Sequence, residues 1–441
     1  MTNAFGRVIL VAWSLLLFQG TQAQSSFRFD FGTGAVERGY RQVTALNTYS
    51  DTSGFGFDYG SQAIALDRGE SDPLHGDLCT SEGPLFFSVR VPEGTYRVSV
   101  TLGDPWRATT TTIKAESRRL MERKVVTTMG SYRTVSFLVS VWDSIISPGR
   151  SVRLKPREFN KLDWDHKLTL EFTNARPSIE AMTIEPVSRA VTVFLAGNST
   201  VTDQQLEPWA SWGQMIPAMF SDKVAIANHA ASGSTLRASL SRGRLDKILQ
   251  LIKPGDYLFI EFAHNDQKPG SGEKAYTTYN QYLKRYIDSA RAHQAIPVLV
   301  TSTCRRAFDQ NGKLTPTLGQ FPDAMRYEAK KDGVALLDLN RMTRTLYETL
   351  GEAKSRELFV QFPAGTFPGQ QTTLADNTHF SDFGAYELAR CMAHAIGASK
   401  LPLRQYLKPE AGNFDPAHPD DIREWDLPFT PMYTSVKPYG N

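Results

Sequence analysis

The sequence predicts two domains in tandem, an antiparallel β-sandwich followed by an α/β/α domain built on a parallel sheet. The chain has 441 residues, and because a domain usually holds about 100–200 residues, two or three domains are expected. The pattern changes near Arg189. Short strands with turn residues between them precede it, and apolar strands alternating with helical segments follow it. The first pattern is typical of a sandwich, and the second of a parallel sheet with helices on both faces.

The predicted sandwich occupies residues 24–187. Every second residue is apolar in FFSVRV and YRVSVTL, and this alternation places one face of each strand in a core. Turns containing Gly and Pro, such as PEGTY, separate the strands. Six strands are expected here: Phe27–Phe31, Leu85–Val91, Tyr96–Leu102, Val135–Val141, Lys167–Thr173 and Ala181–Glu185.

The predicted parallel sheet lies in residues 190–400. Its strands are continuous apolar runs, as expected where helices bury both faces. They are Val191–Leu195, Val224–Asn228, Tyr257–Phe262, Pro297–Thr301 and Val334–Asp338. Helical spacing is found in Tyr276–His293, Met325–Lys331 and Phe383–Ile396. Residues 401–441 have no periodicity, and we expect them to wrap around the second domain because Trp425, Phe429 and Tyr433 are unfavourable in water.

Composition and the N-terminal residues restrict the class of protein. The formal net charge of +3 argues against a dedicated nucleic-acid binder, and 41% hydrophobic residues exclude a largely disordered chain. Residues 1–23 have the pattern of a signal peptide, with Arg7, the apolar run Val8–Phe18 and an ending at Ala23. This run of 11 residues is shorter than the roughly 20 needed to span a bilayer. We therefore expect a periplasmic or extracellular protein without membrane insertion. Oligomeric state stays open.

The three cysteines, Cys79, Cys304 and Cys391, are too few and too widely spaced for a disulfide framework. Buried free thiols are the favoured interpretation, and a disulfide among them cannot be assigned from sequence. No CxxC or HExxH motif is present, so the sequence signals no metal site and we expect no cofactor.

Polar residues follow the first three strands of the predicted sheet. Ser199 follows the first, Gly233 the second and Asn265 the third, while Asp376 and His379 precede the last helix. Because the carboxyl ends of parallel strands meet at one edge of a sheet, these residues should lie close together.

This set supplies what acyl transfer from an ester requires. A serine hydroxyl is a weak nucleophile until a base takes its proton, and we assign these roles to Ser199 and His379. Asp376 would fix the tautomer of the imidazole and stabilise its charged form. The backbone N–H groups of Ser199 and Gly233 and the amide of Asn265 would bind the oxyanion. Gly233 lacks a Cβ, so its backbone can approach closely.

The four blocks around Ser199, Gly233, Asn265 and His379 resemble those of the SGNH (GDSL-type) hydrolases. GNSTVTDQ and AHNDQ are most similar to the rhamnogalacturonan acetylesterase branch, carbohydrate esterase family 12. The segment RFDFGTG…GYRQVT resembles the galactose-binding-like sandwich that precedes some bacterial members. The resemblance implies a flavodoxin-like α/β/α domain that removes acetyl groups from pectic polysaccharide. Asn198 and Ala263 depart from the Asp and Gly that the family usually carries there.

Several alternatives remain open at this point. Ser199 and Asp376 have ordinary interpretations as capping residues, and Gly233 and Asn265 as turn residues. For His264, support of the Asn265 loop is favoured over contact with substrate. Two tryptophans lie in EPWASWGQM, a predicted helix, where core packing is expected for at least one: Trp209 and Trp212. Four basic residues form a solvated helix face or recognise a uronic acid carboxylate: Arg237, Arg242, Arg244 and Lys247.

Two other functions compete with a pectic acetylesterase. One is an esterase with another substrate, such as acetylated xylan or a methyl ester, because loops set specificity. The other is a carbohydrate-binding protein with an inert hydrolase domain. For the sandwich, a packing partner is favoured over an independent sugar-binding module, whose candidate stacking residues are Tyr49, Trp106 and Trp142.

Overall fold

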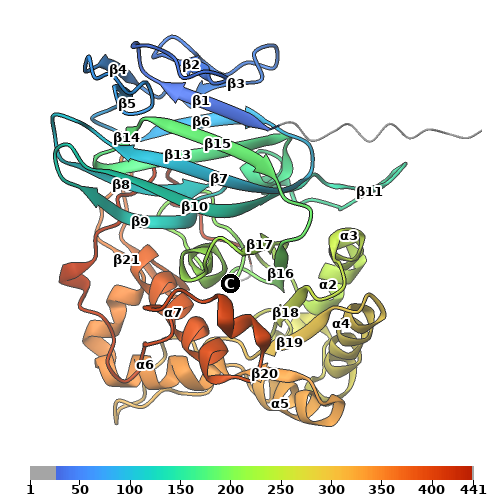
Figure 1. Cartoon of the computed structure of the whole chain (residues 1–441). Coiled ribbons are helices and arrows are strands. Elements are labelled where there is room, and N and C mark those ends of the chain that lie inside the picture. The colour runs from blue at the N-terminus through green and yellow to red at the C-terminus, as the bar shows by residue number, and fades with distance from the viewer. Residues whose placement is uncertain (1–25, 440–441) are drawn as a thin grey trace, which may run out of the picture.

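The computed structural model describes residues 26–439, so the predicted signal peptide at residues 1–23 lies outside the described part of the chain. A β-sandwich is stacked on one end of an α/β/α domain (Figure 1). This arrangement confirms the predicted fold class.

The sandwich consists of two five-stranded sheets with the orders β10-β7-β15-β1-β2 and β3-β6-β13-β8-β9. Apolar side chains from both sheets form its core, in which the rings of Phe29 and Phe87 pack edge to face, with centroids 5.2 Å apart. The strands of the first sheet are β1 (Phe27–Phe31), β2 (Arg41–Val43), β7 (Gly94–Gly103), β10 (Tyr132–Val141) and β15 (Ala181–Pro186). Those of the second are β3 (Phe55–Asp58), β6 (Leu85–Arg90), β8 (Thr109–Ala115), β9 (Arg119–Thr127) and β13 (Lys167–Arg176).

Smaller strands complete this domain. A three-stranded sheet contains β4 (Ile64–Asp67), β5 (Asp77–Thr80) and β14 (Ser178–Ile179), and a ribbon contains β11 (Ile145–Ser147) and β12 (Arg150–Ser151). The sequence predicted six strands of the sandwich, β1, β6, β7, β10, β13 and β15. It missed the other four strands of the two large sheets, β2, β3, β8 and β9, and the smaller strands.

The second domain has a five-stranded parallel sheet of order β17-β16-β18-β19-β20. In chain order this is 2-1-3-4-5, the flavodoxin-like arrangement, whose ligands bind at the carboxyl ends of the strands. The strands are β16 (Val191–Gly197), β17 (Val224–Asn228), β18 (Tyr257–Glu261), β19 (Ile296–Val300) and β20 (Ala335–Leu337). All five strands that the sequence predicted are therefore present.

Helices cover both faces of this sheet (Figure 1). One face packs on α2 (Leu236–Ser241), α3 (Arg244–Leu251), α4 (Asn280–Ala292) and α5 (Phe321–Asp332). The other packs on α1 (Trp212–Met215), α6 (Leu339–Lys354) and α7 (Asp382–Ala398). A ribbon of β21 (Phe359–Phe362) and β22 (Leu374–Phe380) precedes α7.

The tryptophan segment is only partly helical. Ser211 caps α1, its Oγ accepting a hydrogen bond from the Gln214 N–H, so Trp212 is helical and Trp209 lies before the helix. The helix predicted around both residues was therefore too long. Both indole rings are buried, and Trp212 belongs to the core beneath the sheet.

The C-terminal segment wraps around the second domain, as predicted. Trp425 packs against Phe383 and Tyr386 of α7. Further along, the carbonyl of Met432 accepts a hydrogen bond from the Glu207 N–H at 2.7 Å. The segment thereby reaches the junction between the two domains.

The three cysteines are buried free thiols, as expected. Among residues 26–439, no helix combines the length and apolar character needed to cross a membrane. In that same range, no group of three or more His, Cys, Asp or Glu side chains is arranged to hold a metal ion.

Candidate active site

Ser199, His379 and Asp376 form a continuous chain of hydrogen bonds. Ser199 directly follows the turn at the end of β16, while Asp376 and His379 lie on β22. The Nε2 atom of His379 lies 2.9 Å from Ser199 Oγ, and its Nδ1 atom lies 2.8 Å from Asp376 Oδ2. All three residues are nearly completely buried. The side chains predicted as nucleophile, base and orienting acid therefore meet at the carboxyl edge of the sheet.

The Asp376 carboxylate is held in its charged form. Burial would raise its pKa, but the hydrogen bond and charge of His379 and two backbone N–H groups outweigh burial and lower it. These N–H groups belong to Thr378 and His379 and donate to Oδ1 at 2.7 and 3.0 Å. Ser381 caps α7 in place of Asp376, accepting the Gly384 N–H. Asp376 is thus free to orient the imidazole.

The loops carrying Gly233 and Asn265 meet beside Ser199. Asn265 Nδ2 donates to the Ser234 carbonyl at 3.1 Å, which holds the amide beside Gly233. Gln204 Nε2 donates to the Ser199 carbonyl at 3.0 Å and joins the nucleophile loop to the Ser232 hydroxyl at 3.4 Å. Gly233 has a φ of +72°, a left-handed conformation that glycine adopts without strain. The three predicted oxyanion-binding residues are thus brought together.

Asn198 preserves the polar turn before the nucleophile. Its Oδ1 accepts hydrogen bonds from the Thr200 N–H at 3.1 Å and from the Thr200 hydroxyl at 3.0 Å. The same hydroxyl lies 2.9 Å from Glu261 Oε1, and burial raises the pKa of Glu261 to about 7. Asn198 therefore makes the contacts that the turn requires, without a negative charge.

His264 is a supporting residue of the Asn265 loop. Its Nε2 atom lies 3.1 Å from Thr303 Oγ1, and its carbonyl accepts a hydrogen bond from Arg305 at 3.2 Å. Burial, and secondarily the charge of Arg305, hold the pKa of His264 well below its usual value. A neutral, fully buried imidazole fits the favoured interpretation.

The basic stretch after Gly233 mostly faces the sandwich. Arg244 pairs with Glu158 at 2.5 Å, and Lys247 pairs with Glu93 at 2.5 Å and with Asp143 at 3.3 Å. Of the other two residues of the stretch, Arg242 donates to the Arg153 carbonyl at 2.9 Å, and Arg237 pairs with Glu273 at 2.9 Å with its side chain half exposed. Neither sequence interpretation holds for Arg244 and Lys247, which are buried in contacts between domains.

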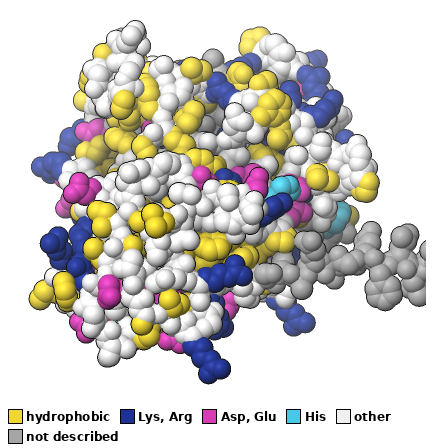
Figure 2. Space-filling view, turned by 90° about the horizontal axis from the view of Figure 1, so that it is seen from above, with side chains coloured by type: hydrophobic (Ala, Val, Ile, Leu, Met, Phe, Trp, Pro, Cys, Tyr) yellow, Lys and Arg dark blue, Asp and Glu magenta, His cyan; other side chains and the backbone are white. Residues whose placement is uncertain are grey.

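The three aromatic residues proposed for sugar stacking differ in exposure. Trp142 is buried against His229, with ring centroids 4.5 Å apart. The Arg68 guanidinium lies 4.7 Å from the centre of the Trp106 ring, which stays 55% exposed, and the Lys167 ammonium lies 4.7 Å from the centre of the Tyr49 ring. On the sandwich side of the molecule, hydrophobic, basic and acidic side chains are interspersed and no single patch dominates (Figure 2).

A cavity lined by Gln204 and Trp209, which contact Ser199 and His379, is built from three parts of the chain. Its volume is about 360 Å³, and it is lined by the sandwich, the nucleophile loop and the C-terminal segment. Trp209 forms one wall, and its ring meets the His379 imidazole edge-on at 5.7 Å. Arg157 and Lys161 of the sandwich line the opposite part. Their charged groups donate to the main-chain oxygens of Lys437 and Asp203, respectively.

Lys437 also contacts the predicted triad, since its Nζ lies 3.1 Å from Asp376 Oδ2. Sequence reasoning missed Arg157, Lys161 and Lys437. They belong to no strand-end motif, and only the path of the C-terminal segment and the docking of the sandwich bring them to the site.

Comparisons with known proteins match both domains. Residues 195–385 match the GDSL-like Lipase/Acylhydrolase family, and residues 27–144 match the galactose-binding domain-like family of β-agarase and YXIM-like esterases. The chain is 43% identical over 228 residues to rhamnogalacturonan acetylesterase RhgT of Bacillus subtilis, which covers 51% of this chain and 98% of that protein.

A second relative spans both domains. It is the uncharacterized esterase YxiM of Bacillus subtilis, which is 26% identical over 377 residues, 82% of this chain and 88% of that protein. The crystal structure of YxiM is matched with 24% identity and a TM-score of 0.45, over 86% of this chain and 100% of that chain.

Proposed function

The chain belongs to the GDSL-like lipase/acylhydrolase family and is a carboxylic ester hydrolase, and from this premise we propose that it removes O-acetyl groups from pectic polysaccharide. The observation that carries the proposal is the hydrogen-bonded chain from Ser199 through His379 to Asp376. In this arrangement a base lies beside the nucleophile and a carboxylate orients the base.

In the first half of the reaction, Ser199 Oγ attacks the acetyl carbonyl carbon while His379 Nε2 takes the hydroxyl proton. The carbonyl electron pair moves to oxygen, and the N–H groups of Ser199 and Gly233 with the Asn265 amide stabilise that oxyanion. The intermediate then expels the sugar oxygen, which takes the proton from His379. An acetyl group remains on Ser199.

Water completes the cycle by the same route. His379 takes a proton from a water molecule, and the resulting hydroxide attacks the acetyl carbonyl carbon. The second tetrahedral intermediate expels Ser199 Oγ, to which His379 returns the proton. Asp376 stabilises the imidazolium in both halves. Acetate is released, and no reactant other than water is required.

The cavity beside Trp209 supports an acidic sugar polymer as substrate. Guanidinium and ammonium groups suit the carboxylates of uronic acids. Arg157 and Lys161 supply these groups in the lining of the cavity, whereas Trp209 is nearly completely buried. RhgT is named as a rhamnogalacturonan acetylesterase. Export to the periplasm or the medium, where such polymers are met, rests on the pattern of residues 1–23.

Acetate release from acetylated rhamnogalacturonan tests this function, with acetylated xylan as the competing substrate. We expect release from the pectic polymer, and a loss of at least about 10³-fold in Ser199→Ala, since removing a triad nucleophile leaves only residual catalysis. Release from xylan alone would keep the mechanism and reject the substrate. Equal release by wild type and Ser199→Ala would reject the mechanism.

A further inference from the structure

The turn between β8 and β9, residues 116–118, and the first residue of β9, Arg119, project from the sandwich into the catalytic domain. We call these four residues the clamp turn. Glu116 and Arg118 have φ angles of 55° and 62°. These values lie in the left-handed region, which residues other than glycine rarely adopt. Two such residues in one turn persist only where the surroundings hold them, and strain of this kind is concentrated at functional sites.

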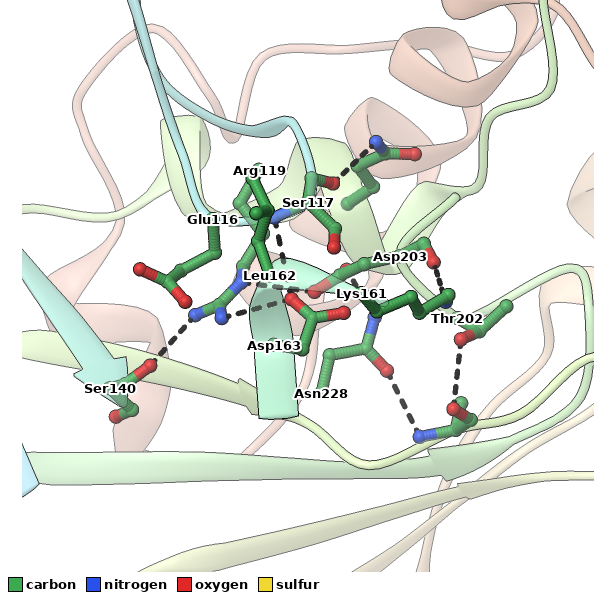
Figure 3. Close-up of polar contacts among 12 residues, drawn as sticks. Glu116, Ser117, Arg119, Ser140, Lys161, Leu162, Asp163, Thr202, Asp203 and Asn228 are labelled. Atoms are coloured by element: carbon green, nitrogen blue, oxygen red, sulfur yellow. Dashed lines mark hydrogen bonds and ion pairs between the residues drawn. The ribbon is translucent and has the colours of Figure 1, made fainter. Parts of the chain in front are cut away.

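Arg119 of the clamp turn binds the nucleophile loop. Its Nε lies 3.0 Å from Asp203 Oδ2, and its other nitrogens reach Asp163 Oδ1 at 3.3 Å and the Ser140 carbonyl at 3.1 Å (Figure 3). Asp203 in turn accepts a hydrogen bond from Asn228 Nδ2 at 2.6 Å. Arg119 thus fixes the loop after Ser199 to the carboxyl end of β17.

Arg118 binds the next residue of that loop. Its Nη1 donates to the Gln204 carbonyl at 3.0 Å, and the side chain of Gln204 holds the Ser199 carbonyl at 3.0 Å. One residue therefore separates the sandwich from the nucleophile. Movement of the Gln204 backbone would be transmitted directly to Ser199.

Arg118 also holds the histidine side of the site. Nη1 donates to the Trp209 carbonyl at 2.9 Å, and the Trp209 ring packs against His379. Nη2 lies 2.8 Å from Asp382 Oδ1, three residues beyond His379, and 2.5 Å from Glu207 Oε2. A single guanidinium therefore joins the nucleophile loop, the Trp209 wall and the start of α7.

Only arginine can make this set of contacts. Arg118 is 3% exposed, and its planar fork meets two carbonyls and two carboxylates at once. A lysine ammonium is a point charge on a flexible stem and cannot reproduce that geometry. Ion pairs of this kind contribute little net stability because desolvating both partners offsets their attraction. Their geometric precision points to positioning.

We propose that Arg118 is a positioning residue for the ester hydrolysis, through which the sandwich sets the distance between Ser199 and His379. The sandwich is then a structural part of the catalytic centre. This inference rests on the proposed function, since it concerns the same nucleophile and base.

Kinetics of Arg118→Lys test the proposal, with p-nitrophenyl acetate as a small substrate that needs no polymer cavity. The lysine keeps a positive charge beside Glu207 and Asp382 but cannot hold both carbonyls. We expect kcat to fall about 10- to 100-fold, the effect of misplacing reacting groups by about 1 Å. We expect KM to change less than about two-fold, since contacts to substrate are unaltered.

Lys247→Met is the matched control for Arg118→Met. Each variant removes a buried cation that pairs with two carboxylates at the domain interface, but Lys247 contacts Glu93 and Asp143, away from the catalytic loops. We expect both to lose stability and only Arg118→Met to lose kcat. In Arg118→Ala, added guanidinium ion should restore part of kcat by occupying the vacated site.

Retention of full kcat by folded Arg118→Lys would overturn the proposal. An equal loss of kcat in Lys247→Met would also overturn it, because the effect would then belong to the interface in general. If Arg118→Lys does not fold, the test passes to Arg118→Ala. Failure of added guanidinium ion to raise the activity of that variant would overturn the proposal. Ser199→Ala, measured in parallel, distinguishes failure of the proposed function from failure of the positioning role. An active Ser199→Ala refutes the proposed function, whereas an inactive Ser199→Ala beside an unaffected Arg118→Lys refutes only the positioning role.

Discussion

Asp376 at the catalytic edge and Asp77 in the sandwich are both nearly completely buried, yet their pKa values move in opposite directions. Burial raises the pKa of each. Asp376 receives the hydrogen bond and charge of His379 and two backbone N–H groups, and its pKa falls below the usual value. For Asp77, burial, and secondarily the charge of Asp30, outweigh the Gly34 N–H that donates at 2.7 Å, so its pKa rises to about 7.

The comparison teaches that partners, more than burial, decide whether a buried carboxyl group is charged. The catalytic edge supplies donors to the one carboxylate whose charge the reaction uses. In the sandwich, the Glu180 carboxyl oxygens have no hydrogen-bond partner among the described residues, and burial together with the charges of Asp104 and Asp77 raises the pKa of Glu180 to about 9. At Asp104, by contrast, hydrogen bonds from Arg68 and Arg176 outweigh burial and lower the pKa.

Neutralising Asp376 should greatly reduce activity, whereas neutralising Asp77 should not. Asp376→Asn keeps the shape but loses the charge that stabilises the imidazolium, so kcat should fall about 10³- to 10⁴-fold. Asp77→Asn replaces a carboxyl group with a raised pKa by a neutral amide and should leave kcat unchanged. Initial rates of acetate release measure both. Equal losses in the two variants would show that packing, and not charge, matters at Asp376.

Stabilisation of the oxyanion by Gly233 depends on the position of its backbone N–H group, and not on a side-chain charge. Gly233→Ala places a Cβ 2.8 Å from the Cβ of Tyr439, at a φ of +72°. Displacing one oxyanion donor typically costs about 10²-fold in kcat, and the left-handed alanine costs about 1 kcal/mol of stability.

Gly255→Ala is the control for this substitution. The φ of Gly255 is +88°, and no atom lies within 4 Å of the Cβ that alanine would add. Gly255→Ala therefore introduces the same backbone strain as Gly233→Ala without displacing an oxyanion donor. Kinetics and urea unfolding of both variants separate the two effects. A normal kcat in Gly233→Ala would remove Gly233 from the oxyanion site.

The uncharged carboxyl groups of the sandwich predict how stability depends on pH. A group whose pKa is raised in the folded state stabilises the fold below its unfolded pKa, and this contribution is lost as pH rises through the folded value. For Glu180 the window runs from 4.5 to about 9, and for Asp77 from 3.8 to about 7. As pH rises from 5 to 9, the free energy of unfolding should therefore decrease, because the stabilising contributions of Glu180 and Asp77 are lost. Glu180→Gln should flatten the decrease, and an unchanged slope would contradict a neutral Glu180.

The smallest effect is expected at Lys437, whose half-exposed ammonium lies 3.1 Å from Asp376 Oδ2. Half-exposed ion pairs contribute roughly 0.2–1 kcal/mol, so Lys437→Met should change the maximal rate less than about five-fold. Removing a nearby positive charge favours protonation of the catalytic groups. The acid limb of the pH–rate profile should therefore move to higher pH, and a shift to lower pH would contradict the contact.

Much of the catalytic domain could be predicted because strand order and chemistry are coupled at the edge of a parallel sheet. Ser199, Gly233 and Asn265 each follow an apolar strand, so the pattern of apolar runs in the sequence is sufficient to locate them. The clamp turn was not predicted, since Glu116, Arg118 and Arg119 resemble an exposed charged turn in the sequence. They are buried only because the other domain supplies Asp203, Glu207 and Asp382. Contacts between domains, like the path of the C-terminal segment, leave no periodic signal.

Labelling with an organophosphate tests the central claim, that Ser199 is an activated nucleophile, most directly. Mass spectrometry of the digested protein should find one label per chain, on the peptide that contains Ser199. Ser199→Ala should take up none, and His379→Ala should react much more slowly because no base removes the hydroxyl proton. An active enzyme that stays unlabelled, or that carries its label on another residue, would contradict the account.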